Sequence, residues 1–253
     1  MQLHRFYLAP GNCRDATLRL QGREAHHALH VLRLKRGDGV LVLDGVGNEF
    51  SCEVEDAARD RLSLRVQKRN FIPPPPCSLS LFVGIPKGKI IENIIQKSVE
   101  LGARTIAPLL TERVVTRLDE EAAEHKREQW QQVAIEAMKQ CGAAYLPEIL
   151  TPLSVEDFLA RTEKSDLQLV GSLQKERRHP RRIFQEYEKA NRRPPRSVAA
   201  WVGPEGDFTP KELGAIQNSG AQPISLGSLV LRVETAAIYC LSILNYEFNS
   251  PDE

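Results

Sequence analysis

Hydrophobic and polar residues alternate along much of the first 72 positions. This period of two predicts β-strands over 39–45, 48–54 and 61–67, with turn residues at both ends of the first. A short helix is expected over 24–32, before these strands. Several short strands at close spacing are typical of a small barrel.

Four consecutive prolines occupy positions 73–76. Such a run cannot continue a helix or a central strand, and it favours a stiff, extended spacer. The sequence therefore predicts a β-barrel domain over 1–72, a linker over 73–76 and a second domain over 77–253.

The pattern changes after the prolines, where short apolar runs alternate with amphipathic segments of helical period. Gly102 is placed to end one helix, and Thr209 followed by Pro210 to begin another. The predicted strands cover 78–83, 105–110, 167–170, 197–202 and 222–226, and the predicted helices cover 89–101, 119–141, 155–162, 181–189, 209–218 and 235–248. This alternation predicts an α/β domain with a mostly parallel sheet covered on both faces.

Two glycine-bearing loops carry the main candidate chemistry. Gly203-Pro204-Glu205-Gly206-Asp207 follows the strand over 197–202, and Leu226-Gly227 leads through Leu229-Val230-Leu231 to Arg232 at a helix start. Ligands of α/β sheets bind at the carboxyl ends of strands, so we expect both loops to border one site. The phosphate-binding glycine motifs, the nucleophile-elbow motif and the HExxH zinc motif are absent from the sequence.

Charge and cysteine content narrow the range of partners, metal sites and disulfides to be expected. The net charge is +1, but 1–72 carry +3, and 175–196 hold nine Lys/Arg against three Asp/Glu. A run of this kind is usually a solvated face; two basic regions together favour phosphate-backbone contacts. The five cysteines are widely spaced, which disfavours disulfides and zinc, and His26, His27 and His30 lack the further ligands of a metal site. No signal peptide or membrane span is evident, so we expect a soluble cytoplasmic protein.

With these residues in view, the chain resembles the ribosomal RNA small subunit methyltransferase E family, of the SPOUT class. The resemblance extends over essentially the whole chain, and the two glycine loops together are its most specific part. Its further elements are Arg5-Phe6, His27 to Arg33, Gly37-Asp38, Asp44-Gly45, Gln96-Lys97, Glu100 to Gly102, Glu112-Arg113, Glu136-Ala137, Gln140 and Glu234 to Ala236.

The resemblance implies an N-terminal PUA-like barrel that binds RNA and a C-terminal domain with a deep trefoil knot. It also implies a homodimer, S-adenosylmethionine (SAM) as cofactor, no metal, and methylation of N3 of a uridine in small-subunit (16S) ribosomal RNA, as free RNA or within the 30S subunit. The residues it assigns to the cofactor are Leu173, Gly203, Pro204, Gly206, Leu226, Gly227, Leu229, Leu231 and Thr235. Arg232 and Glu205 are the catalytic candidates, and the RNA-binding candidates are Arg5, His27, Arg33, Lys87 and Arg113.

The sequence departs from the family pattern at several positions. Leu229 and Ala143 stand where arginine is usual, Lys139 where glutamate is common, and Asp207 in place of a second glycine. Two missing arginines weaken phosphate and base contacts, for which Lys139 and the basic run over 175–196 could compensate.

Two other function classes remain open at this point. The same fold could serve as a non-catalytic RNA-binding or ribosome-assembly protein, which would not be stabilised by SAM. A small-molecule α/β enzyme would show no salt-dependent affinity for RNA.

Overall fold

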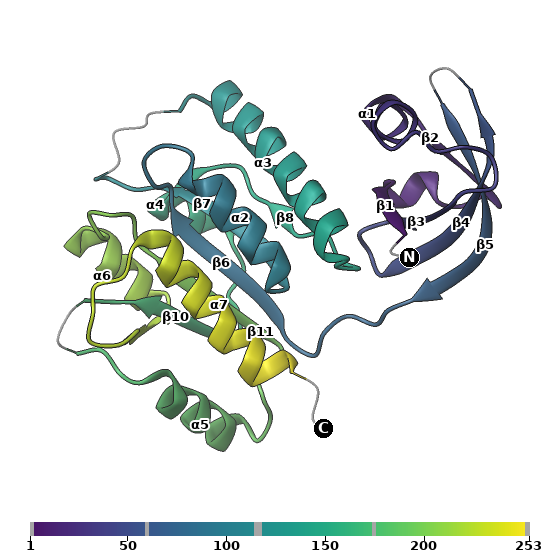
Figure 1. The fold of residues 1–253 in the computed structure, drawn as a ribbon. Coiled ribbons are helices and arrows are strands. Elements are labelled where there is room, and N and C mark those ends of the chain that lie inside the picture. The colour runs from purple at the N-terminus through teal and green to yellow at the C-terminus, as the bar shows by residue number, and fades with distance from the viewer. Residues whose placement is uncertain (1–2, 59–60, 114–117, 174–175, 251–253) are drawn as a thin grey trace. The chain divides into compact units, whose positions relative to one another are not determined.

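The computed structural model describes residues 3–58, 61–113, 118–173 and 176–250. The contacts between its residues divide the chain into two compact units (Figure 1). The first unit comprises 1–74 and 135–146, and the second comprises 75–134 and 147–253. The division falls within the proline run, and it also assigns the end of the long helix α3 (Glu120–Cys141) to the first unit.

The first unit is built on a five-stranded sheet in the order β1-β3-β4-β5-β2. Strand β1 pairs with β3 in parallel, and the remaining pairs are antiparallel. The strands are β1 (His4–Tyr7), β2 (Thr17–Leu20), β3 (Gly39–Leu43), β4 (Asn48–Ala57) and β5 (Leu62–Phe71), with a 3-10 turn at Pro10–Asn12, α1 (Gly22–His26) and the π-helical turn His27–Val31.

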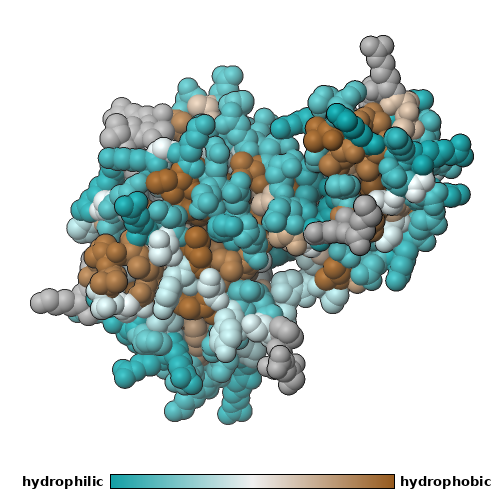
Figure 2. Space-filling view, viewed as in Figure 1, coloured by the Kyte–Doolittle hydropathy of each residue, from teal (hydrophilic) through white to brown (hydrophobic). Residues whose placement is uncertain are grey.

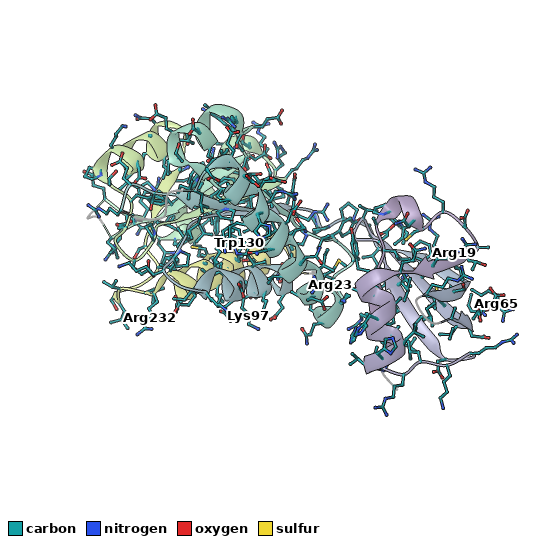
Figure 3. The ribbon with its side chains drawn as sticks, turned by 90° about the horizontal axis from the view of Figure 1, so that it is seen from above. Arg19, Arg23, Arg65, Lys97, Trp130 and Arg232 are labelled. Atoms are coloured by element: carbon teal, nitrogen blue, oxygen red, sulfur yellow. The ribbon has the colours of Figure 1, made fainter. Side chains whose placement is uncertain are left out.

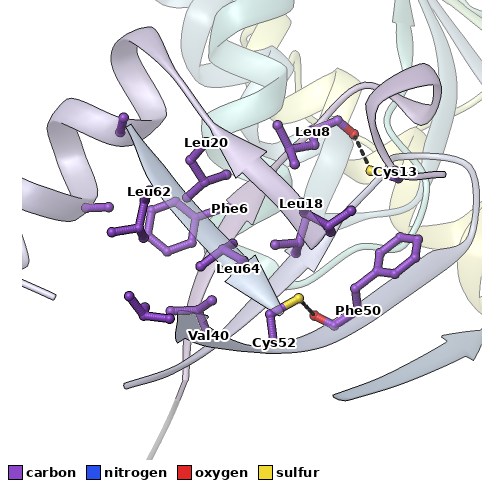
Figure 4. Close-up of a cluster of buried hydrophobic side chains, with 14 residues drawn as sticks. Phe6, Leu8, Cys13, Leu18, Leu20, Val40, Phe50, Cys52, Leu62 and Leu64 are labelled. Carbon is purple, nitrogen blue, oxygen red and sulfur yellow. Dashed lines mark hydrogen bonds between the residues drawn. The ribbon is translucent and has the colours of Figure 1, made fainter. Parts of the chain in front are cut away.

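Alternating apolar side chains of these strands form a core of their own (Figure 4). Phe6, Leu18 and Leu64 are completely buried, and the burial pattern of β4 follows the period of two that the sequence predicts. The alternation thus explains the sheet, but it did not reveal β1 and β2, which have only four residues each.

The last turns of α3 belong to this unit and are held to its N-terminal elements by polar contacts. Lys139 is buried and pairs with Glu24 at 2.7 Å and with Glu136 at 2.9 Å. The Arg5 guanidinium donates to the carbonyl oxygens of Lys139 (3.3 Å) and Gln140 (3.0 Å). Because these carbonyls end a helix and lack helical partners, Arg5 acts as a cap. Arg5, predicted to bind RNA, is therefore engaged in holding the fold.

The second unit contains a parallel sheet in the order β12-β10-β11-β6-β7-β8, with β9 also paired to β7. The parallel α/β architecture predicted from the alternation is confirmed. The strands are β6 (Ser78–Gly84), β7 (Ala103–Leu110), β8 (Glu148–Ile149), β9 (Leu153–Ser154), β10 (Leu167–Gly171), β11 (Ser197–Val202) and β12 (Gln222–Ile224). The remaining helices are α2 (Ile90–Glu100), α4 (Val155–Arg161), α5 (Pro180–Asn191), α6 (Pro210–Asn218) and α7 (Val233–Asn249).

Helices cover this sheet, and α2 and α7 lie side by side over β6 and its neighbours (Figure 1). Trp201 on β11 is fully buried against the rings of Phe82 and Phe158, and its indole N–H donates to Gln168 Oε1 at 3.0 Å. Strand β11 therefore lies at the centre of the unit, and the loop that leaves its carboxyl end starts from a rigid base.

Helix α6 begins as its sequence indicates. The Thr209 hydroxyl accepts from the amide of Glu212, and the Glu212 carboxylate accepts from the amide of Thr209, which forms a capping box. The predicted helix over 24–32 differs, because it is α-helical only to His26 and then continues as a π-helical turn.

Candidate active site

A cavity of about 290 Å³ opens at the carboxyl ends of β10 and β11. It is bounded by the loop over 203–207 and by the segment over 226–233, so the two glycine loops meet at one site. Its lining consists of Gly171, Ser172, Leu173, Arg177, Val202, Gly203, Pro204, Glu205, Asp207, Leu226, Gly227, Leu229, Val230, Leu231, Arg232, Val233 and Ala236.

The first loop is a tight turn in which Asp207 takes the left-handed conformation, with φ of 61°. Its carboxylate accepts from the Phe208 amide at 2.8 Å, and short polar side chains tolerate this region. A Cβ on Gly203 would lie 2.8 Å from the Asp207 carboxylate. The turn therefore requires glycine at 203, and it can accept aspartate where the resembled family has glycine.

Side chains tie this turn to the ends of β6 and β7. Glu205 Oε1 accepts from the Lys87 amide at 3.1 Å, and Arg113 donates to the carbonyl oxygen of Gly206. Below them, the buried Glu212 accepts from the Glu112 amide at 2.9 Å. Three strand-end loops are thus held together by side-chain-to-backbone hydrogen bonds.

The second loop presents apolar side chains to solvent beside the cavity. Leu229 and Val230 are 77% and 76% exposed, and Gly227 adopts a φ of 112° that favours glycine. In Figure 2, hydrophobic surface gathers over the region of this loop between β12 and α7. Exposed apolar side chains at the mouth of a cavity are typical of a binding site.

Charged groups surround this apolar surface. Arg232 is exposed at the N-cap position of α7 and lies at the periphery of its unit in Figure 3. Arg177 is half-buried and donates to the Ser172 carbonyl oxygen at 3.4 Å. Two guanidinium groups and the Glu205 carboxylate therefore face a slot whose walls are mostly apolar.

Nine of the eleven residues predicted for catalysis or cofactor binding line the cavity. Gly206 lies in the same turn and contacts Arg113, and Thr235 is exposed in the first turn of α7. Among the RNA candidates, Lys87 and Arg113 lie at strand ends tied to the cavity loop, whereas Arg5, His27 and Arg33 belong to the first unit.

Sequence reasoning missed several lining residues, Arg177 above all. Arg177 follows β10, and β10 pairs with β12, so the segment after β10 lies beside Pro223 to Ser225. The basic run over 175–196 was visible in the sequence, but its position next to the cavity depends on this strand pairing.

Neither a metal centre nor a membrane helix is found among the described residues. They contain no group of three His, Cys, Asp or Glu side chains able to hold a metal ion. The rings of His26 and His30 lie 4.8 Å apart between centroids with a tilt of 45°, and His27 packs edge-on against Phe6. Within the same ranges, every helix is too short or too polar to cross a bilayer.

Comparison with protein families supplies the decisive observation. Residues 73–245 match the model of an RNA methyltransferase domain, and residues 20–67 match the model of an RNA methyltransferase PUA domain. The chain belongs to the ribosomal RNA small subunit methyltransferase E family. The first match includes the whole cavity, so the site lies in the methyltransferase domain.

Individual relatives agree with this assignment over nearly the full length. The chain is 33% identical to ribosomal RNA small subunit methyltransferase E of Synechocystis sp. over 96% of this chain and 77% of that protein. It is 31% identical to the Bacillus subtilis protein of the same name, over 91% of this chain and 90% of that protein.

Two solved structures with bound SAM have the same fold. A putative methyltransferase from Legionella pneumophila, in complex with SAM, aligns with a TM-score of 0.86 and 30% identity over 99% of this chain and 100% of that one. Ribosomal RNA small subunit methyltransferase E from Neisseria gonorrhoeae, bound to SAM, aligns with a TM-score of 0.85 and 26% sequence identity over 98% of both chains.

Proposed function

We propose that this protein transfers the methyl group of SAM to N3 of a uridine in small-subunit ribosomal RNA. The observation that carries the proposal is the cavity at the ends of β10 and β11, which lies inside the matched methyltransferase domain. Family membership supports the SAM-dependent methylation of ribosomal RNA, and the resemblance supplies the choice of uridine N3.

The lining suits SAM on chemical grounds. An adenine ring needs apolar walls with backbone groups at its edge, and Leu226, Leu231 and Val202 provide such walls beside strand-end backbone. Gly171 and Gly203 allow the backbone to approach without a side chain, and the Arg177 guanidinium can pair with a carboxylate. SAM supplies an electrophilic methyl group on a sulfonium when it is bound.

The remaining task of the protein is to hold the uracil in line with that methyl group. Uridine N3 must lose its proton before or during transfer, so a cation that stabilises the uridylate lowers the barrier. Arg232 is exposed at the cavity and can fill this role. Glu205 is bonded to the Lys87 amide, which favours a positioning role over proton removal.

Further parts of the proposal concern assembly. The first unit would bind RNA as a PUA domain, with His27 partly exposed in the π-helical turn and Arg33 exposed after its end. The substrate would be free RNA or the 30S subunit. Two copies would pair through α7, where Tyr239 and Tyr246 are 45% and 76% exposed. The return of the chain from the edge strand β12 to α7, which packs on β6 and β11, suits a trefoil knot. We also propose that the protein acts in the cytoplasm.

An Arg232→Ala variant tests the proposal. We expect turnover on small-subunit ribosomal RNA to fall about a hundredfold, because the charge acts in the transition state. SAM affinity, measured by calorimetry, should change less than about threefold. Equal losses of turnover and SAM affinity would contradict the role of Arg232.

A wild-type protein that binds SAM but leaves uridine N3 unmethylated would contradict the proposed reaction. A protein that binds ribosomal RNA and is not stabilised by SAM would favour the non-catalytic alternative.

A further inference from the structure

A cluster of basic side chains lies beside the cavity, at the start of α5. Arg177, Arg178, His179, Arg181, Arg182 and Gln185 surround one shallow depression. We call these six residues the arginine cluster. Arg177 lines both this depression and the cavity, so the two adjoin at that residue.

Backbone bonds fix the cluster to the cavity loop. The Arg178 amide donates to the Pro223 carbonyl oxygen at 3.0 Å, and the Ser225 amide donates to the Arg178 carbonyl oxygen at 2.9 Å. Ser225 directly precedes the cavity segment over 226–233. The position of the cluster relative to the cavity is therefore set by the sheet and not by a free loop.

The side chains of the cluster divide into held and free groups. Arg178 pairs with Glu186, and Arg177 donates to Ser172. Arg181 and Arg182 are exposed, and neither side chain forms an ion pair with any of the described residues. Two guanidinium groups are thus open to an external anion.

His179 adds a further donor. Its Nδ1 accepts from the Arg181 amide at 3.2 Å, which caps α5. In the neutral ring, the proton then resides on Nε2, which is left to donate outward. The start of α5 itself also carries a partial positive charge, which adds to the field of the arginines.

The composition of the depression indicates its ligand. Every lining residue is charged or polar, whereas a protein partner would need an apolar centre. Arginine forks match phosphate oxygens in two-point contacts. A chain of phosphates therefore fits this surface better than a protein.

We propose that the arginine cluster holds the phosphate backbone of the RNA strand that leads into the cavity. This inference rests on the proposed function and adds a contact site on the methyltransferase unit, separate from the PUA match over 20–67. On this assignment the phosphates next to the target nucleotide lie along Arg181 and Arg182, on the side of the cavity that Arg177 borders.

The test is an Arg181→Gln/Arg182→Gln double variant of the full chain, compared with Lys189→Gln/Arg196→Gln. The control removes the same charge from exposed residues of the same basic run that lie outside the depression, so it separates the depression from the run as a whole. We expect the affinity of the double variant for small-subunit ribosomal RNA to fall about tenfold. Each phosphate contact with a single strand contributes about 0.7 to the slope of log affinity against log salt. The loss of two contacts should therefore make the slope shallower by about 1.4.

Turnover at saturating RNA and SAM affinity should stay at wild-type values, and so should both RNA readouts of the control. An unchanged affinity and slope in the double variant, or an equal loss in the control, would overturn the proposal. The binding assay needs no turnover. A wild-type protein that binds RNA through this cluster but does not methylate it would support the docking surface while removing the proposed function.

Arg181 also borders a groove with Tyr239 and Tyr246 on α7. Sedimentation of the double variant therefore accompanies the binding assay. A changed oligomeric mass, together with normal RNA affinity in an Arg182→Gln single variant, would assign Arg181 to contact between copies and overturn its role at the RNA.

Discussion

At the mouth of the cavity, the carboxylate of Glu205 accepts from the Lys87 amide at 3.1 Å. A glutamine can accept the same hydrogen bond, but it cannot remove a proton. We expect Glu205→Gln to keep kcat/KM within about threefold of the wild-type value. Glu205→Ala should lower kcat/KM about tenfold or more, because alanine cannot accept the hydrogen bond from the Lys87 amide. Steady-state kinetics over a range of pH measures both. If the glutamine variant is as inactive as the alanine variant, Glu205 acts in proton removal instead.

The thiols provide a second prediction at this scale. Burial raises the pKa of Cys13 to about 11 and the pKa values of Cys52, Cys77 and Cys240 to about 12, from an ordinary value of 9.0. The folded state then keeps protons that the unfolded chain releases above pH 9. Stability is therefore complete below that pH and falls as pH rises toward the folded values, by up to ~1.4 kcal/mol per pH unit for each thiol.

Urea unfolding at pH 8 and pH 10 measures this loss. Because other groups also titrate there, Cys240→Ala serves as the control and should show a smaller fall between the two pH values. An identical fall in wild type and variant would show that Cys240 does not contribute. In the native protein at neutral pH, a thiol reagent should modify the exposed Cys141 well before the other four.

Among the structural elements, the close approach of β6 to the cavity turn depends on Gly84. A Cβ at this position would lie 2.6 Å from Pro204 Cδ and 2.8 Å from Pro204 N. We expect Gly84→Ala to displace the turn over 203–207, to weaken SAM binding about tenfold, and to cost about 1–3 kcal/mol of stability. Calorimetry and thermal unfolding measure the two effects.

Gly214 is the matched control, because it lies inside α6 with no atom within 4 Å of a built Cβ. Gly214→Ala should stabilise the helix by about 1 kcal/mol and leave SAM binding unchanged. Equal SAM affinities in the two variants would show that the turn adapts to the added methyl group.

The elements also show how far the sequence alone could lead. The periods of two and 3.6 residues located most strands and helices, because each element buries one face or stripe, as β4 does. Strands β1 and β2 were missed, since four residues carry too little period and their pairing partners lie far along the chain. The glycine loops pointed to the cavity, but the place of Arg177 depends on the β10–β12 ladder, which the local pattern does not contain.

For the whole molecule, the two units provide separate spectroscopic signals. The sequence contains two tryptophans, Trp130 and Trp201, and both belong to the second unit. Tryptophan fluorescence therefore reports on the unfolding of the second unit, whereas far-ultraviolet circular dichroism reports on both. Each unit has its own hydrophobic core, so each can respond to a substitution in its own way.

The buried pair of Lys139 with Glu24 makes this separation testable. Lys139 is 7% exposed, and removing it leaves the carboxylate of Glu24 largely buried without its partner. We expect Lys139→Ala to destabilise the first unit by about 3 kcal/mol, since breaking a buried pair is far costlier than losing an exposed one. The transition seen by circular dichroism should then split, with its early phase invisible to tryptophan fluorescence.

The control is Lys97→Ala, which breaks the exposed pair with Glu100 (Figure 3 labels Lys97) and should cost less than about 1 kcal/mol of stability. If Lys139→Ala shifts the fluorescence midpoint as much as the dichroism midpoint, α3 couples the two units into one cooperative transition, and they do not unfold separately.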